Sequence, residues 1–227
     1  VSDENGHGTF LASVAAGGEN IQEGFTGAAS EAEIAVVKLK EAKDYLRKFY
    51  GIRQKAVCYQ ETDIVQGLRY LHLLALKKQK PLVMCVALGT NLGGHNGMSS
   101  LSRILGSYSR LVDRCVVIGG GNEANERHHF QGKLNQVGEV QEVEMRVESG
   151  NTGFVAELWG TIPNIVTAYL ISPSGERSPV ISIRQGSRYQ LTFPFEQTVV
   201  DVEYQLFLRD GRSQLLFLKF DHPAQGI

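Results

Sequence analysis

His7 lies between two glycines at the head of a segment that has the spacing of a helix. Its apolar residues recur at Phe10, Leu11, Val14 and Ala15, and Gly17-Gly18 predicts its end. The flanking glycines let the backbone turn sharply and let another part of the chain approach the imidazole. A helix start also presents unpaired N–H groups and the positive end of the helix dipole, which favour a neutral imidazole. His7 is therefore a candidate general base, although a lone histidine in a Gly-rich turn is more often an ordinary polar residue.

Asn122 is the second residue whose setting suits catalysis. It follows the apolar run 115–118 and three consecutive glycines at 119–121. Its amide can project from a tight turn toward a carbonyl oxygen, as the donor in an oxyanion hole does. Two other interpretations stay open here: an asparagine in a left-handed turn, and, more weakly, a nucleotide-binding glycine loop, for which the dinucleotide spacing is missing.

The elements that would position these residues predict an α/β domain with a parallel sheet over residues 1–135. Expected strands are Ile34–Leu39, Leu82–Leu88 and Cys115–Ile118. Expected helices are Ala42–Tyr50, a helix capped by Asp63 that runs to about Gln79, and Met98–Asp113. In such sheets function lies at the carboxyl ends of the strands, where Gly89 and Asn122 both fall.

From about residue 136 the pattern changes to alternation of apolar and polar residues, which is typical of strands. The alternating runs are 140–147, 154–158, 166–170, 189–193, 202–208 and 216–220. Ser174-Gly175 and Asp210-Gly211 are the expected hairpin turns. We predict that residues 136–227 form a second domain, an antiparallel β-sandwich.

Composition limits the classes of partner. The chain has 227 residues, 42% of them hydrophobic, and a formal net charge of -1, so neither nucleic acid nor a membrane surface is expected as a partner. The cysteines Cys58, Cys85 and Cys115 lack the spacing of a zinc site and are expected to be buried free thiols. The histidines His95, His128 and His129 are expected to be exposed loop residues; no metal or other cofactor is expected.

The histidine segment and the later Gly-Asn segment, taken together and in this order, resemble those of subtilisin-like serine proteases, the subtilases (peptidase family S8). The segments 38–43, 59–64, 88–97 and 119–123 are similar to those of the clostridial Csp group, which are spore-associated subtilases. The resemblance implies a subtilisin-like three-layer fold with a parallel sheet, present here in part, followed by an inserted jelly-roll domain.

The same resemblance implies roles for particular residues. His7 would be the general base, and Asn122 would belong to the oxyanion hole. Ala87, Leu88 and Gly89 would pair with the backbone of a protein or peptide substrate, as an exposed strand edge can; a plain strand end is the alternative.

The sequence also departs from the subtilase pattern. It contains no Gly-Thr-Ser-x-Ala motif for the nucleophile. The triad aspartate of subtilases lies well upstream of the histidine, so Asp3 and Glu4 are not expected to fill that role. We therefore expect a fragment of a longer serine endopeptidase that is inactive alone.

Two alternatives to a protease stay open. Some Csp proteins have lost triad residues, so the parent protein could be a non-catalytic sensor in spore germination. Under either interpretation the resemblance implies a germination proenzyme or a related Csp protein as partner, and a spore-associated or extracellular location. The second alternative is a carbohydrate-binding β domain, with a sugar-stacking face formed by Trp159, Tyr169, Tyr189 and Tyr204.

Overall fold

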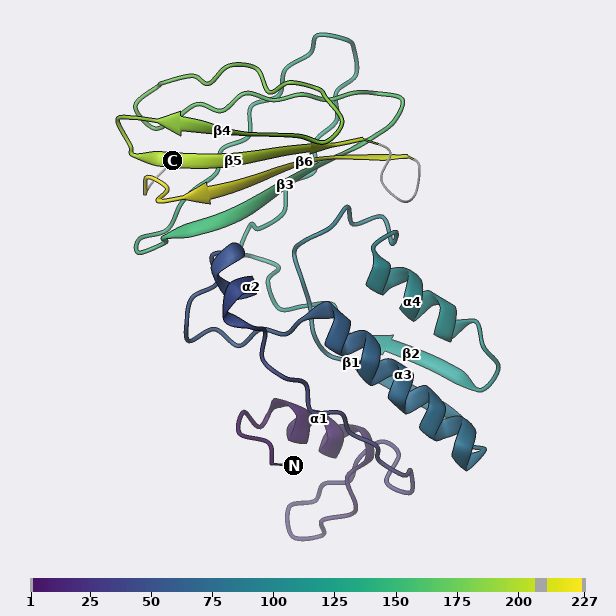
Figure 1. The fold of residues 1–227 in the computed structure, drawn as a ribbon. Helices are drawn as coiled ribbons and strands as arrows, with labels where there is room; N and C mark the ends of the chain where they lie inside the picture. Colours follow the sequence, from purple (N-terminus) through teal and green to yellow (C-terminus); the bar gives the residue numbers. More distant parts are fainter. Residues whose placement is uncertain (1, 207–211, 226–227) are drawn as a thin grey trace.

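A computed structural model describes residues 2–206 and 212–225 of the chain. Helices and a small parallel sheet occupy its first half, and a larger antiparallel sheet occupies the second half (Figure 1). The elements of the first half are α1 (His7–Ala16), α2 (Asp44–Phe49), α3 (Glu61–Lys78), β1 (Leu82–Val86), α4 (Ser100–Ser109) and β2 (Arg114–Ile118). Those of the second half are β3 (Gly153–Thr161), β4 (Ser187–Phe193), β5 (Thr198–Gln205) and β6 (Ser213–Asp221).

The first half is built on the parallel pair β1 and β2, which α3 and α4 cover on one face. Met84 and Val86 of β1 point into this layer, where they meet Leu68 of α3 and Leu105 of α4. Burying each of these side chains contributes about 1.5–3 kcal/mol. The expected α/β arrangement, with helices packed against parallel strands, is confirmed.

The opposite face of the parallel pair is open. Val83 of β1 and Val117 of β2 are exposed, and so are Cys85 and Cys115. The prediction that these two cysteines are buried is therefore wrong. Side chains alternate between the two faces of a strand, and only one face of this sheet is covered in the described part of the chain.

Two details of the first half differ from expectation. Residues 34–39 were expected to form a strand, but they form none, because no described strand runs beside them. They pass along α3 instead, where the absence of a side chain at Gly67 lets Val37 approach the helix closely. Helix α3 begins two residues before Asp63, which lies in its first turn, and Gln60 occupies the cap position. An acidic side chain in the first turn suits the helix dipole as well as it suits the cap.

The second half forms one antiparallel sheet with the strand order β3-β6-β5-β4. Its core face carries Val200, Val202 and Tyr204 of β5 beside Leu216 and Leu218 of β6, all buried. Residues 166–181 pass over this face and add Ile181 to the core. Backbone hydrogen bonds link the two arms of this segment, among them those from Ser178 N–H to the Leu170 carbonyl and from Ile181 N–H to the Ala168 carbonyl.

Four of the six alternating runs correspond to strands, which are β3, β4, β5 and β6. The runs at 140–147 and 166–170 form no strand of the sheet. Ser174-Gly175 lies in a tight turn, as predicted, where Gly175 N–H donates to the Ser172 carbonyl; Asp210-Gly211 lies outside the described residues. The second sheet of the expected β-sandwich or jelly roll, and the domain boundary at 135/136, stay predictions.

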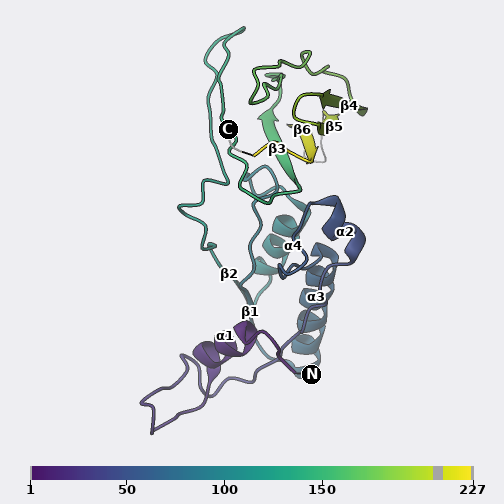
Figure 2. The same cartoon turned by 90° about the vertical axis from the view of Figure 1, so that its left-hand side faces the viewer.

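The other face of the antiparallel sheet lies against the first half of the chain (Figures 1 and 2). The Phe49 ring of α2 stacks on Phe217 of β6 with centroids 5.9 Å apart. Gly51 lies so close to the Gly153 carbonyl that a Cβ would overlap it. The antiparallel sheet is thus covered on both faces, in contrast to the parallel pair.

The strand register also separates the aromatic residues of the proposed sugar-stacking face. Tyr204 pairs with Leu216, and Trp159 pairs with the next residue, Leu215, so Tyr204 and Trp159 point to opposite faces of the sheet. Tyr204 is buried, and its hydroxyl donates to the Gln214 side chain. These aromatic residues therefore form no single face for a sugar.

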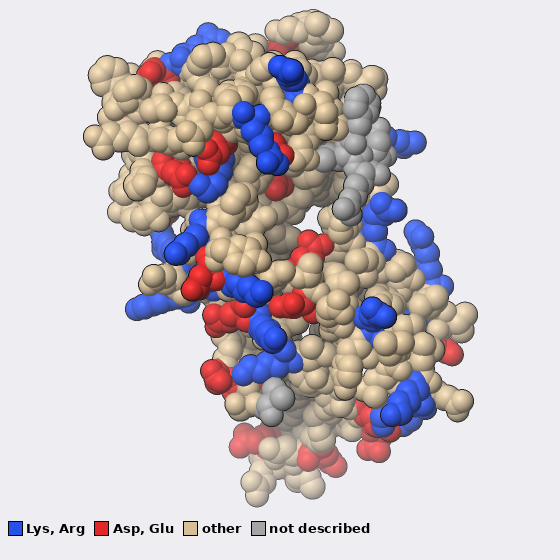
Figure 3. Space-filling model, in the orientation of Figure 1, with Lys and Arg blue, Asp and Glu red and all other residues tan. Residues whose placement is uncertain are grey.

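No helix in the described residues combines the length and the apolar character needed to cross a membrane. On the face drawn in Figure 3, basic and acidic side chains are interspersed over both halves.

Candidate active site

His7 is the first residue of α1, as the sequence predicts. The residue before it, Gly6, has a left-handed backbone with φ of 84°, which glycine adopts at little cost. The side chain is exposed, and its Nε2 lies 3.2 Å from the carbonyl oxygen of Ala87. The helix start thus brings His7 to Ala87, which directly follows β1 and is 80 residues away in the sequence.

Asp3 fixes the backbone around His7. One carboxylate oxygen accepts hydrogen bonds from the N–H groups of Asn5 and Gly6, and the other accepts from the N–H and the hydroxyl of Thr9. These hydrogen bonds hold the pKa of Asp3 well below its ordinary value, and the bond from the Thr9 hydroxyl has the largest effect. Asp3 therefore serves as a carboxylate cap for α1; the Asp-to-Thr spacing is a sequence signal that could have indicated it.

Asn122 follows β2 and lies on the surface. The left-handed position in this turn falls on Gly121, with φ of 82°, and not on Asn122. The interpretation of Asn122 as a left-handed turn residue therefore does not hold. Its backbone places the amide beyond the carboxyl end of the sheet, where a donor to an oxyanion can lie.

The ends of the two parallel strands stay close beyond the sheet. Gly119 N–H donates to the Val86 carbonyl at 3.0 Å, and a Cβ at Gly119 would lie 3.6 Å from the Ala87 Cα. Ala87 and Leu88 are partly exposed and Gly89 is exposed. The structure thus brings the three predicted substrate-binding residues and the glycines before Asn122 to one edge of the sheet.

A polar cluster joins the loops that follow β1 and β2. The Asn91 amide donates to Glu123, and His128 Nδ1 lies 3.0 Å from the same carboxylate oxygen. Hydrogen bonds from His128 and then Asn91 lower the pKa of Glu123, which favours the charged carboxylate. Nearby, the rings of His95 and His129 stack with centroids 4.5 Å apart.

Asn91 and Glu123 have no role predicted from the sequence, although both lie in segments that resemble the Csp group. The three loop histidines are exposed, as predicted. Among the described residues, no three His, Cys, Asp or Glu side chains are grouped so that they could hold a metal ion.

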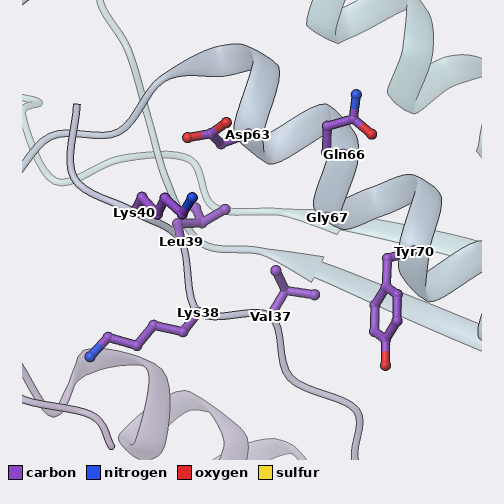
Figure 4. A pocket seen from close by; sticks show the side chains of 8 residues that line it. All are labelled: Val37, Lys38, Leu39, Lys40, Asp63, Gln66, Gly67 and Tyr70. Carbon is purple, nitrogen blue, oxygen red and sulfur yellow. The ribbon is translucent and has the colours of Figure 1, made fainter. Parts of the chain in front are cut away.

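One cavity of about 250 Å³ lies away from these residues, between α3 and the extended segment 37–40 (Figure 4). Asp63, Gln66 and Tyr70 line its α3 side, whereas Lys38 points away from that helix. The Lys38 amino group donates instead to the Ser2 carbonyl. None of the predicted catalytic or substrate-binding residues lines this cavity.

The mixed α/β fold agrees with the family comparison. The Subtilase family model (Peptidase S8) matches residues 1–196, so the chain belongs to the subtilase family. The comparison with curated proteins finds no match.

Among solved structures, the chain is similar to the CspB protease of Clostridium perfringens, with a TM-score of 0.81 and 24% sequence identity. The match covers 99% of this chain and 44% of the CspB chain. This likeness shows a shared fold, and the chain spans less than half the length of that protein.

Proposed function

We propose that the protein to which this chain belongs is a serine endopeptidase that cleaves peptide bonds through an acyl-enzyme. The observation that supports the proposal is the 3.2 Å contact between His7 Nε2 and the Ala87 carbonyl, because His7 then lies beside the segment that we expect to bind substrate. Membership of the subtilase family supports the reaction class.

In this proposal each residue has one task. His7 takes the proton from the attacking serine and returns it to the leaving amine. The Asn122 amide donates a hydrogen bond to the oxyanion, and Ala87, Leu88 and Gly89 pair with the backbone of the protein or peptide substrate. The 227-residue chain contains no Gly-Thr-Ser-x-Ala motif, so we expect it to be inactive by itself.

A fluorophosphonate probe tests the proposal on the full-length protein that contains these residues. The probe reacts with a serine whose base and oxyanion hole are assembled, so we expect labelling that His7→Ala abolishes. Asn122→Ala should slow labelling by about 10²–10³-fold. His222→Asn is the matched control, because this exposed histidine lies after β6 and should leave the rate unchanged.

Absence of labelling in a folded protein, with any propeptide removed, would contradict the proposal. It would favour the alternative of a non-catalytic subtilase that acts by binding. In that case a germination proenzyme or a related Csp protein would be the partner to test by direct binding.

A further inference from the structure

The loop between β1 and α4, residues 87–99, rises toward the antiparallel sheet (Figure 1). One carboxylate of that sheet holds it there. Gly93 N–H donates to Glu157 Oε2 at 2.7 Å, and Trp159 Nε1–H donates to the same oxygen at 2.8 Å. A Cβ at Gly94 would lie 3.0 Å from Trp159 Cε3, so the loop backbone rests directly on the indole.

The same loop reaches the proposed oxyanion residue through a second contact. The Asn91 amide donates to Glu123, and Glu123 follows Asn122 directly in the chain. His128 Nδ1, 3.0 Å from the carboxylate, adds a contact within the loop after β2. Contacts of the loop 87–99 thus connect the antiparallel sheet to Asn122.

We propose that Glu157 is a positioning residue of the active site, which acts through Gly93, Asn91 and Glu123 to hold Asn122 in place. This inference rests on the proposed function and assigns to the second half of the chain a residue that supports catalysis without touching substrate. Glu157 and Trp159 are both partly buried, so the hydrogen bonds between them compete less with water than surface bonds do. Asn91 and Glu123 are exposed and depend on their neighbours for a fixed position.

An oxyanion hole requires that its hydrogen-bond donor be held in a fixed position. A donor stabilises an oxyanion only when it is held within about 0.5 Å of the productive geometry. Asn122 follows three glycines, which leave its backbone many accessible conformations. An external restraint on the next residue, Glu123, would remove much of that freedom.

Hydrogen exchange, measured by mass spectrometry on the full-length protein, tests the restraint without requiring activity. Glu157→Ala should raise exchange in the peptides that cover 89–97 and 119–123 by about ten-fold or more, because a hydrogen bond to a charged group is lost. Glu157→Gln keeps an acceptor and should restore most of the protection. Glu203→Ala is the matched control: Glu203 of β5 and Glu157 of β3 both pair with Phe217 and so lie on the same face of the sheet, but Glu203 binds Arg188 and Gln205.

Asn91→Ala tests whether Glu157 restrains residues 119–123 through Asn91. It should raise exchange in 119–123 and leave the Gly93 amide protected, since that amide bonds to Glu157. Unchanged exchange in 119–123 in either variant, or an equal rise with Glu203→Ala, would overturn the proposal. If Glu157→Ala does not fold, Asn91→Ala and Glu157→Gln decide the question.

The activity of the same variants separates this inference from the proposed function. Glu157→Ala and Asn91→Ala should each lower kcat by about ten-fold, less than loss of Asn122 itself, while KM stays within about two-fold. The double variant should fall no further than the slower single variant, because both act through one connection. A wild type that does not label contradicts the proposed function, whereas the exchange data still decide whether Glu157 restrains residues 119–123.

Discussion

The two sheets of this chain differ in how they are covered. The antiparallel sheet is packed on both faces, by residues 166–181 on one side and by the first half of the chain on the other. The parallel pair is packed on one face only in the described residues. Within β1, Met84 is 1% exposed while its neighbour Val83 is 66% exposed.

The part of the chain that contributes most to stability is not the part proposed to carry out catalysis. The larger buried cluster belongs to the second half, whereas the residues proposed to act in catalysis lie at the start of α1 and on loops at the edge of the smaller, parallel sheet. Loops can carry reactive groups only when a rigid support fixes them. Here part of that support comes from the neighbouring half, through the contact between Glu157 and Gly93.

The largest expected effect is on the free energy of unfolding, and it appears when a substitution at a buried position is compared with one on the open face of the parallel pair. In the 227-residue chain, Leu216→Ala should lower the free energy of unfolding by about 2–5 kcal/mol, because Leu216 is 1% exposed in the main core. Val83→Ala should change it by less than about 0.5 kcal/mol. Urea denaturation measures both values. Equal losses would show that the open face is packed in solution and that the two sheets do not differ.

A second comparison concerns the contact between the halves. Gly51→Ala and Gly24→Ala both place a side chain at positive φ, 65° and 62°, so both carry the same backbone strain of about 1–2 kcal/mol. A Cβ at Gly51 would also overlap the Gly153 carbonyl, whereas one at Gly24 meets nothing within 4 Å. Gly51→Ala should therefore be the more destabilising of the two by at least about 1 kcal/mol. Equal thermal shifts would mean that the halves separate easily.

Thiol reactivity tests the open face without changing stability. Cys85 and Cys115 are exposed, while Cys58 is partly buried and its sulfur accepts a hydrogen bond from Arg47. In the native chain the first two should react with a disulfide reagent at least about ten-fold faster than Cys58, because the reagent must reach the sulfur. Cys85→Ser and Cys115→Ser variants assign the rates. Reaction of all three only at the rate of unfolding would contradict an open face.

Much of the fold could be predicted from local pattern. Helical spacing located α1, α3 and α4, and alternation located the four strands of the antiparallel sheet, because both signals lie within one segment. The error at residues 34–39 has a different source. An apolar run shows that a segment can form a strand, but a ladder also needs a neighbouring strand, which is not encoded in the run itself. The exposure of Cys85 has a different cause, because an apolar run does not show whether both faces of its sheet are covered.

The site could be predicted where sequence neighbours carry it. Glycines around His7 and before Asn122 led to the prediction of two catalytic residues, and the order of the strands placed Gly89 and Asn122 at one edge of the sheet. Glu157 could not be found in this way, since its partner Gly93 is 64 residues away and neither residue type is unusual in its segment. Such contacts depend on how the two halves meet, which single-segment patterns do not describe.

The smallest expected effect is on the pH dependence of Tm, and it compares one surface ion pair in each half of the chain. Hydrogen bonds from Lys78, then Lys80, lower the pKa of Glu33 to about 2, and Arg188 lowers the pKa of Glu203 in the same way. A lowered folded pKa means that each pair stabilises the fold fully above about pH 4.5 and ceases to do so as the pH falls through the folded pKa. Glu33→Gln and Glu203→Gln should therefore each reduce the loss of Tm that the chain shows between pH 5 and pH 2.

Salt distinguishes the two pairs. The Glu33 side chain is 51% exposed and that of Glu203 is 22% exposed, so added salt should screen the first pair more strongly. At high ionic strength we expect the effect of Glu33→Gln on the Tm profile to vanish while part of the effect of Glu203→Gln remains. A Glu33 effect that survives salt would mean that the loop containing Glu33 is packed more closely against α3 than the exposure of the first half implies. The two halves would then differ in the size of their cores rather than in the exposure of their side chains.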